Sequence, residues 1–124
     1  HQTDWERALE FSFRSLTIFK AMNNLWEVSK IYNSIATIYN SKARYDSALL
    51  YFREGLKLDY QMNYPTGIAS SYNNIASTCL LLSQPDSAEW YINKALAIAT
   101  EISDPDLVNY YVTLGWTYPV NLDA

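Results

Sequence analysis

The segment Tyr32-Asn33-Ser34-Ile35-Ala36 returns forty residues later as Tyr72-Asn73-Asn74-Ile75-Ala76. A weaker third copy, one residue short of that offset, reads Tyr111-Val112-Thr113-Leu114-Gly115. Three further sets keep the forty-residue offset twice over: Ala8, Ala48 and Ala88; Leu16, Leu56 and Leu96; Ile18, Leu58 and Ile98. Recurrence at a fixed offset of this length is typical of repeat proteins. The sequence therefore predicts a chain built from units of about forty residues.

The apolar residues inside each unit follow a helical period. In the stretch 45–60, Ala48, Leu49, Phe52 and Leu56 fall on one face of a helix. Pro65, Pro85 and Pro105 lie twenty residues apart and are predicted to mark helix starts, where the missing N–H has no partner to lose. No segment keeps the alternation of a half-buried strand. The predicted helices are 4–22, 26–41, 45–61, 65–82, 85–102 and 105–118.

The spacing inside each unit resembles the tetratricopeptide repeat. Tyr32, Ile35-Ala36 and Tyr39 match the first helix of that motif, and Ala48 and Phe52 match the second. The long unit is similar to those of kinesin light chains and of bacterial regulatory arrays. The resemblance implies an all-α fold, a right-handed superhelix (α-solenoid) of antiparallel helix pairs with about six helices.

The register predicts one array over residues 1–124 that starts and ends inside a repeat. It contains a half repeat at 4–22, repeats at 26–61 and 65–102, and a half repeat at 105–118. We expect a fragment of a longer array, whose open ends would be covered by neighbouring repeats or by self-association.

The amino-acid composition argues against most metal-dependent and nucleophilic chemistry. The chain has one Cys, one His and a formal charge of −4, so we expect no metal site, no cofactor and no nucleic-acid binding by this domain. No run of 18 apolar residues is present, so no membrane span is predicted. Carboxylates such as Asp86 and Asp104 fall at predicted helix starts, where they favour capping over acid–base work. We expect no catalytic residue and no enzyme activity.

Polar side chains recur on the first helices, which line the concave groove in the resembled family. Asn33 and Asn73 are predicted to face away from the Ile/Ala packing side and to bind the backbone of an extended peptide, or else to cap or bridge helices. The predicted peptide-binding residues are Lys30, Asn33, Thr37, Ser70, Asn73, Asn74, Ser77, Asn109 and Trp116. Because Lys30 is the only cation on this strip, an internal peptide is preferred to a C-terminal carboxylate.

Two function classes follow from these observations. The first is a non-catalytic scaffold that binds a protein or peptide segment in its groove. The alternative is the sensor domain of a larger bacterial signalling or transcription-regulating protein. The sequence leaves the compartment open, since one Cys fits the cytoplasm and an exported or periplasmic segment is equally allowed.

Overall fold

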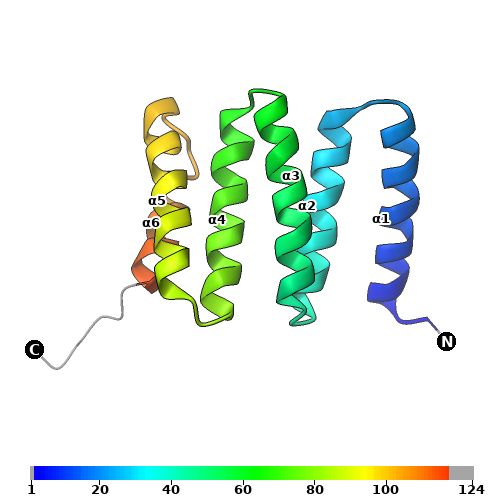
Figure 1. The fold of residues 1–124 in the computed structure, drawn as a ribbon, viewed down its shortest axis with the longest axis horizontal. Coiled ribbons are helices and arrows are strands. Elements are labelled where there is room, and N and C mark those ends of the chain that lie inside the picture. The colour runs from blue at the N-terminus through cyan, green and yellow to red at the C-terminus, as the bar shows by residue number, and fades with distance from the viewer. Residues whose placement is uncertain (1, 118–124) are drawn as a thin grey trace, which may run out of the picture. The chain divides into compact units, whose positions relative to one another are not determined.

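The computed structural model describes residues 2–117, which form six α-helices and no strand. The helices are α1 (Asp4–Ala21), α2 (Leu25–Ser41), α3 (Tyr45–Gln61), α4 (Pro65–Leu81), α5 (Pro85–Ile102) and α6 (Leu107–Thr117), and successive helices within a unit run antiparallel (Figure 1). The chain divides into two compact units, the first with α1–α3 and the second with α4–α6. The prediction of an all-helical fold of about six helices is confirmed.

The predicted helix ranges agree with the described helices to within two residues at each end. Pro65 and Pro85 are the first residues of α4 and α5, as predicted. The prediction for Pro105 was wrong, because α6 begins two residues later at Leu107. The Asp104 carboxylate accepts a hydrogen bond from the backbone N–H of Asp106 at 2.9 Å, and Leu107 N–H donates to the Asp104 carbonyl at 3.1 Å. These two bonds close a turn around Pro105 before the helix starts. Residue 118, the predicted end of this helix, lies outside the described residues.

All five helix connections among the described residues use the same backbone turn. A residue with positive φ follows each helix at intervals of twenty: Asn23, Ala43, Asn63, Ser83 and Ser103, with φ between 51° and 58°. The next residue donates its N–H back to the carbonyl five positions earlier, as Arg44 does to Tyr39 at 2.9 Å. This left-handed ending satisfies carbonyls that the last helical turn leaves free. One helix and the turn after it therefore always take up twenty residues, so each turn falls at the same position of the repeat.

The core of the first unit lies between its three helices. Leu9 and Leu16 of α1 pack with Val28, Tyr32 and Ile35 of α2. Tyr51 of α3 closes this cluster, because its ring lies 6.1 Å from that of Tyr32 and 5.9 Å from that of Phe13. The small residues Ala36 and Ala48 are completely buried, as the close approach of paired helices requires.

The core of the second unit repeats this arrangement. Ile75 and Ala76 of α4 and Ala88 and Ile92 of α5 have no exposed surface. The ring of Tyr72 lies 6.1 Å from that of Tyr91, which matches the pair Tyr32 and Tyr51 in the first unit. Cys79 is buried in this core, which agrees with its interpretation as a small apolar residue.

We predict that Ala43→Gly stabilises the protein. Ala43 has φ 58°, a left-handed conformation that strains an L-residue with a Cβ and suits glycine. The free energy of unfolding should rise by about 0.5–1 kcal/mol, measured by urea denaturation. Ala97→Gly is the matched control, because Ala97 lies exposed inside α5. The same substitution there should lower stability by about 0.5–1 kcal/mol. Equal changes at both positions would contradict the role of the turn.

Candidate functional site

A groove between α4 and α6 is the candidate site of the second unit. Its volume is about 560 Å³, and its lining is mostly apolar. Six residues line it: Ser77, Leu80, Leu81, Val112, Thr113 and Trp116. Both helices that form the groove are first helices in the repeat register, the class that the resemblance assigns to a concave binding surface.

Helix geometry explains why these residues meet. Ser77, Leu80 and Leu81 are spaced by three and four positions, so they share one face of α4. Val112, Thr113 and Trp116 have the same spacing on α6. Trp116 has 78% of its surface exposed, and Leu81 and Val112 each have more than half exposed. The groove therefore presents large apolar side chains to solvent.

The walls of the groove carry no formal charge. Neither α4 nor α6 contains a Lys, Arg, Asp or Glu. The polar groups on the lining are hydroxyls, and that of Thr113 donates to the Asn109 carbonyl at 3.2 Å. The Thr113 oxygen keeps its capacity to accept a hydrogen bond. The lining therefore offers apolar side chains and hydroxyl groups and no charged side chain.

The predicted site residues of the second unit lie in or beside this groove. Ser77 and Trp116 line it directly. The half-buried Ser70, Asn73 and Asn74 precede Ser77 by seven, four and three positions, and so continue its face toward the start of α4. Asn109 is exposed on α6, two turns before Trp116. The sequence analysis missed Leu80, Leu81 and Val112 as groove residues.

The other predicted site residues belong to α2 in the first unit. Lys30 is exposed and forms an ion pair with Glu27 on its own helix, at 3.6 Å. The hydroxyl of Thr37, also exposed, donates to the Asn33 carbonyl at 2.8 Å. Both side chains thus interact with their own helix and remain open to solvent.

The carbonyl oxygen of the Asn33 side chain faces the neighbouring helix. Asn33 Oδ1 is buried without a hydrogen-bond partner, and a Cβ built on Gly55 of α3 would lie 3.2 Å from it. Asn73 Oδ1 is likewise buried without a partner. The expectation that these Asn side chains face away from the packed side is therefore wrong for their oxygen atoms. Neither oxygen accepts a hydrogen bond, so the alternative interpretation, in which the Asn residues cap or bridge helices, stays a prediction.

A buried polar cluster lies beside Asn33. Asp59 is 3% exposed, and its Oδ1 accepts a hydrogen bond from Ser29 Oγ at 2.8 Å. Ser29 Oγ also lies 3.4 Å from the Gly55 carbonyl. The corresponding residues of the second unit, forty positions on, are Ala69, Ala95 and Ala99. The contact between the first and second helix is therefore polar in the first unit, between α2 and α3, and has alanines at the same positions in the second unit, between α4 and α5.

We predict that Ser29 and Asp59 are energetically coupled. Ser29→Ala removes a donor from a buried carboxylate and should cost about 1–3 kcal/mol of unfolding free energy. In an Asp59→Ala background the same change should cost much less, because the double variant matches the alanine arrangement of the second unit. A double-mutant cycle by urea denaturation measures this coupling. Equal costs of Ser29→Ala in both backgrounds would show that the hydrogen bond contributes nothing.

Tyr110 of α6 is a buried titratable group with a strongly raised pKa. Its side chain is 2% exposed, and burial, together with the negative charges of Asp104 and Asp106, raises its pKa to about 12. Tyr110 therefore stays neutral at physiological pH. Its hydroxyl and Asp104 Oδ2 are both buried without a hydrogen-bond partner of good geometry. Tyr110 lies in the first turn of α6, and Asp104 lies in the connection just before this helix.

The described residues contain neither a cluster of metal ligands nor a helix suited to cross a membrane. No three His, Cys, Asp or Glu side chains within residues 2–117 gather closely enough to hold a metal ion. In the same part of the chain, no helix has the length and apolar character that a bilayer crossing needs.

Comparison with known proteins supports the repeat register. Residues 29–62 and 69–101 match a model of the tetratricopeptide repeat, and each segment covers most of one first helix and of the second helix after it. The chain is 33% identical over 110 residues to the uncharacterized protein ycf37 of Guillardia theta, which covers 89% of this chain and 56% of that protein. The chain thus spans about half the length of this curated relative.

The fold also matches a solved structure, that of BtubC (BKLC) from P. vanneervenii. The TM-score is 0.82 at 24% identity, over 92% of this chain and 48% of that one. Tetratricopeptide repeats generally mediate protein–protein interactions, and the family is generally non-catalytic. The helix register, the two matched repeats and the 33% identical relative together show that the chain belongs to the tetratricopeptide-repeat family.

Proposed function

We propose that the second unit binds an extended, uncharged segment of a partner protein in the groove between α4 and α6. The observation that carries this proposal is the groove itself, which presents Leu81, Val112 and Trp116 to solvent. Its volume of about 560 Å³ lies within the range of about 300–1,000 Å³ usual for ligand sites. An apolar side chain of the partner, inserted beside Trp116, would anchor the segment.

The absence of charge on α4 and α6 supports an uncharged segment. A terminal carboxylate needs Lys or Arg to replace its hydration, and neither helix carries one. Asp104 and Asp106 precede α6 and would oppose an acidic ligand. An internal peptide segment with apolar side chains therefore fits this groove better than a charged tail.

Polar groups beside the groove suit a peptide backbone. The hydroxyls of Ser77 and Thr113 lie on the lining, and Asn74 and Asn109 belong to the same two helices. A carboxamide offers a donor and an acceptor, so it can bind the backbone of a peptide whatever its side chains. We propose that apolar contact at Trp116 supplies most of the affinity and that these polar groups fix the direction of the segment.

Peptides selected from a random library on the wild-type chain test this proposal. Trp116→Ala should weaken their binding by about 2 kcal/mol, roughly thirtyfold in Kd, because an exposed Trp in a groove is a typical hot spot. The fold should be unchanged by circular dichroism, since Trp116 is mostly exposed. The selected peptides should be rich in apolar residues, and their Kd should vary little with salt.

Trp90→Ala is the matched control. Trp90 is also exposed and belongs to the same unit, but it lies on α5 and does not line the groove. Its replacement should leave the Kd unchanged. Equal losses in the two Trp variants, or selected peptides that depend on a charged terminus, would contradict the proposal.

A further inference from the structure

The lining of the groove between α4 and α6 offers few hydrogen-bond acceptors to a bound segment. The hydroxyl groups of Ser77 and Thr113 supply two oxygens, and the remaining lining side chains contain none. Backbone carbonyls inside the two helices already accept from N–H groups of the same helix. The Thr113 hydroxyl donates to the Asn109 carbonyl at 3.2 Å, so toward a ligand it can only accept. Most N–H groups that a segment turns toward the lining would therefore be buried without a partner.

The same groove offers donors for the carbonyl groups of a segment. The indole N–H of Trp116 donates and cannot accept, and 78% of the surface of Trp116 is exposed. Asn74 and Asn109 add carboxamide N–H groups on the same two helices. A bound segment is thus better served at its C=O groups than at its N–H groups.

Proline is the residue that fits this imbalance. It has a backbone C=O and no backbone N–H, so a proline turned toward the lining leaves no donor unpaired. Proline-rich segments already form the polyproline II helix before binding, with no internal hydrogen bonds, and therefore lose little conformational entropy when they bind. Aromatic-lined grooves are known to bind such segments. Here Trp116 supplies an exposed aromatic ring, and Leu81 and Val112 supply apolar walls.

The open side of the groove is a side of the first helix that stays open when a second helix is present. α4 is followed by α5, yet Leu81 of α4 is 55% exposed and Ser77 is partly exposed. The packed side of α4 is a different one, where Ile75 and Ala76 are completely buried. In the repeat register Trp116 corresponds to Ser77, one residue short of the forty-residue offset. The exposure of Trp116 is therefore a property of its position in the repeat.

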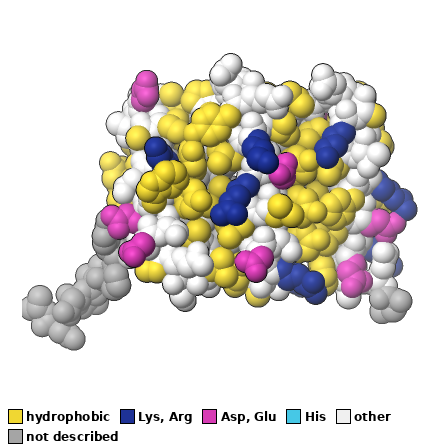
Figure 2. Space-filling view, viewed as in Figure 1, with side chains coloured by type: hydrophobic (Ala, Val, Ile, Leu, Met, Phe, Trp, Pro, Cys, Tyr) yellow, Lys and Arg dark blue, Asp and Glu magenta, His cyan; other side chains and the backbone are white. Residues whose placement is uncertain are grey.

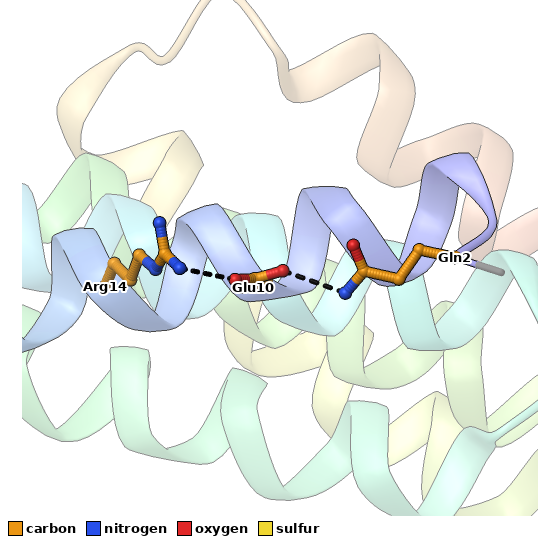
Figure 3. A network of polar contacts seen from close by, with 3 residues as sticks. All are labelled: Gln2, Glu10 and Arg14. Atoms are coloured by element: carbon orange, nitrogen blue, oxygen red, sulfur yellow. Dashed lines mark hydrogen bonds and ion pairs between the residues drawn. The ribbon is translucent and has the colours of Figure 1, made fainter.

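The absence of charge distinguishes this groove from other surfaces of the chain. On the face shown in Figure 2, Lys, Arg, Asp and Glu side chains lie among the hydrophobic ones. On α1, Arg14 binds Glu10 at 2.6 Å, and Glu10 accepts from Gln2 at 2.8 Å (Figure 3). Neither α4 nor α6 carries a charged side chain, so their groove is electrostatically complementary to an uncharged segment.

We infer that the segment bound between α4 and α6 is an uncharged polyproline II stretch, with a proline ring packed on the indole of Trp116. The inference rests on the proposed function, because it names the class of segment that this groove binds. A carbonyl group of the stretch accepts from the Trp116 indole N–H. The proline ring also contacts the apolar walls that Leu81 and Val112 form.

Isothermal titration calorimetry with the selected library peptides tests this inference. The tightest-binding peptide should contain proline, and it is resynthesised with each proline replaced in turn by alanine and by N-methylalanine. At one proline or more, alanine should weaken binding about tenfold, because it restores the N–H and loosens the free peptide. N-methylalanine also lacks the N–H, so it should weaken binding only about threefold.

Two protein variants locate the proline on the groove. In Trp116→Ala the proline and alanine peptides should bind equally to within about twofold, because the ring that distinguishes them is gone. The variant should keep its fold, since Trp116 is mostly exposed. Trp90→Ala is the control, because Trp90 is exposed on α5 and does not line the groove. It should keep the full tenfold preference for proline.

The possible failures separate this inference from the proposed function. Selected peptides without proline that still lose affinity in Trp116→Ala would overturn the inference and leave the proposed function standing. Peptides that bind Trp116→Ala as tightly as the wild type would overturn both. An N-methylalanine peptide that binds as weakly as the alanine peptide would also overturn the inference, because the missing N–H would then not be what the groove selects.

Discussion

The fold depends on one packing constraint: the apolar face of a first helix is buried only where a second helix lies close to it. Ala36 and Ala76 on the first helices, and Ala48 and Ala88 on the second, are all fully buried. Their size lets two backbones approach until Tyr32 can reach Tyr51, and Tyr72 can reach Tyr91. Among the described residues, large apolar side chains of α1 and α6, such as Phe11 and Val108, stay exposed. In repeat proteins the burial of a helix face depends on the adjacent helices, because each unit is stabilised mainly by contacts with its neighbours.

The sequence was sufficient to predict the helices, because their apolar period and the forty-residue offset report the same register. The left-handed backbone geometry of the turns between them was not predicted. Five residues adopt positive φ without a single glycine: Asn23, Ala43, Asn63, Ser83 and Ser103. Asparagine favours this conformation, but alanine and serine do not, so only the spacing of twenty residues connects all five turns. Pro105 was predicted to start a helix because Pro65 and Pro85 do. Instead, Pro105 lies in a turn that a hydrogen bond to the Asp104 side chain closes, and residue spacing does not encode such a bond.

The candidate site was predicted in part, for a related reason. A search for recurring residues finds Asn33 and Asn73, but a residue's position on a helix does not determine its side-chain rotamer, and Asn33 Oδ1 faces α3. The groove consists largely of residues that break the repeat. Leu80 and Leu81 stand where the first unit has Asn40 and Ser41, and Val112 and Trp116 stand where α4 has Asn73 and Ser77. The sequence signal for the groove was the presence of apolar residues at positions where the corresponding repeat has polar ones.

Val112 and Trp116 line the groove between α4 and α6 from the α6 side. The most direct measurement of the central claim is the footprint of a library-selected peptide on the ¹⁵N-labelled chain, read from amide chemical shifts. The account predicts that the largest shifts fall on residues 77–81 of α4 and 112–116 of α6, with little change on α1 and α3. Shifts centred on α1, α3 or the exposed side of α5 around Trp90 would contradict it.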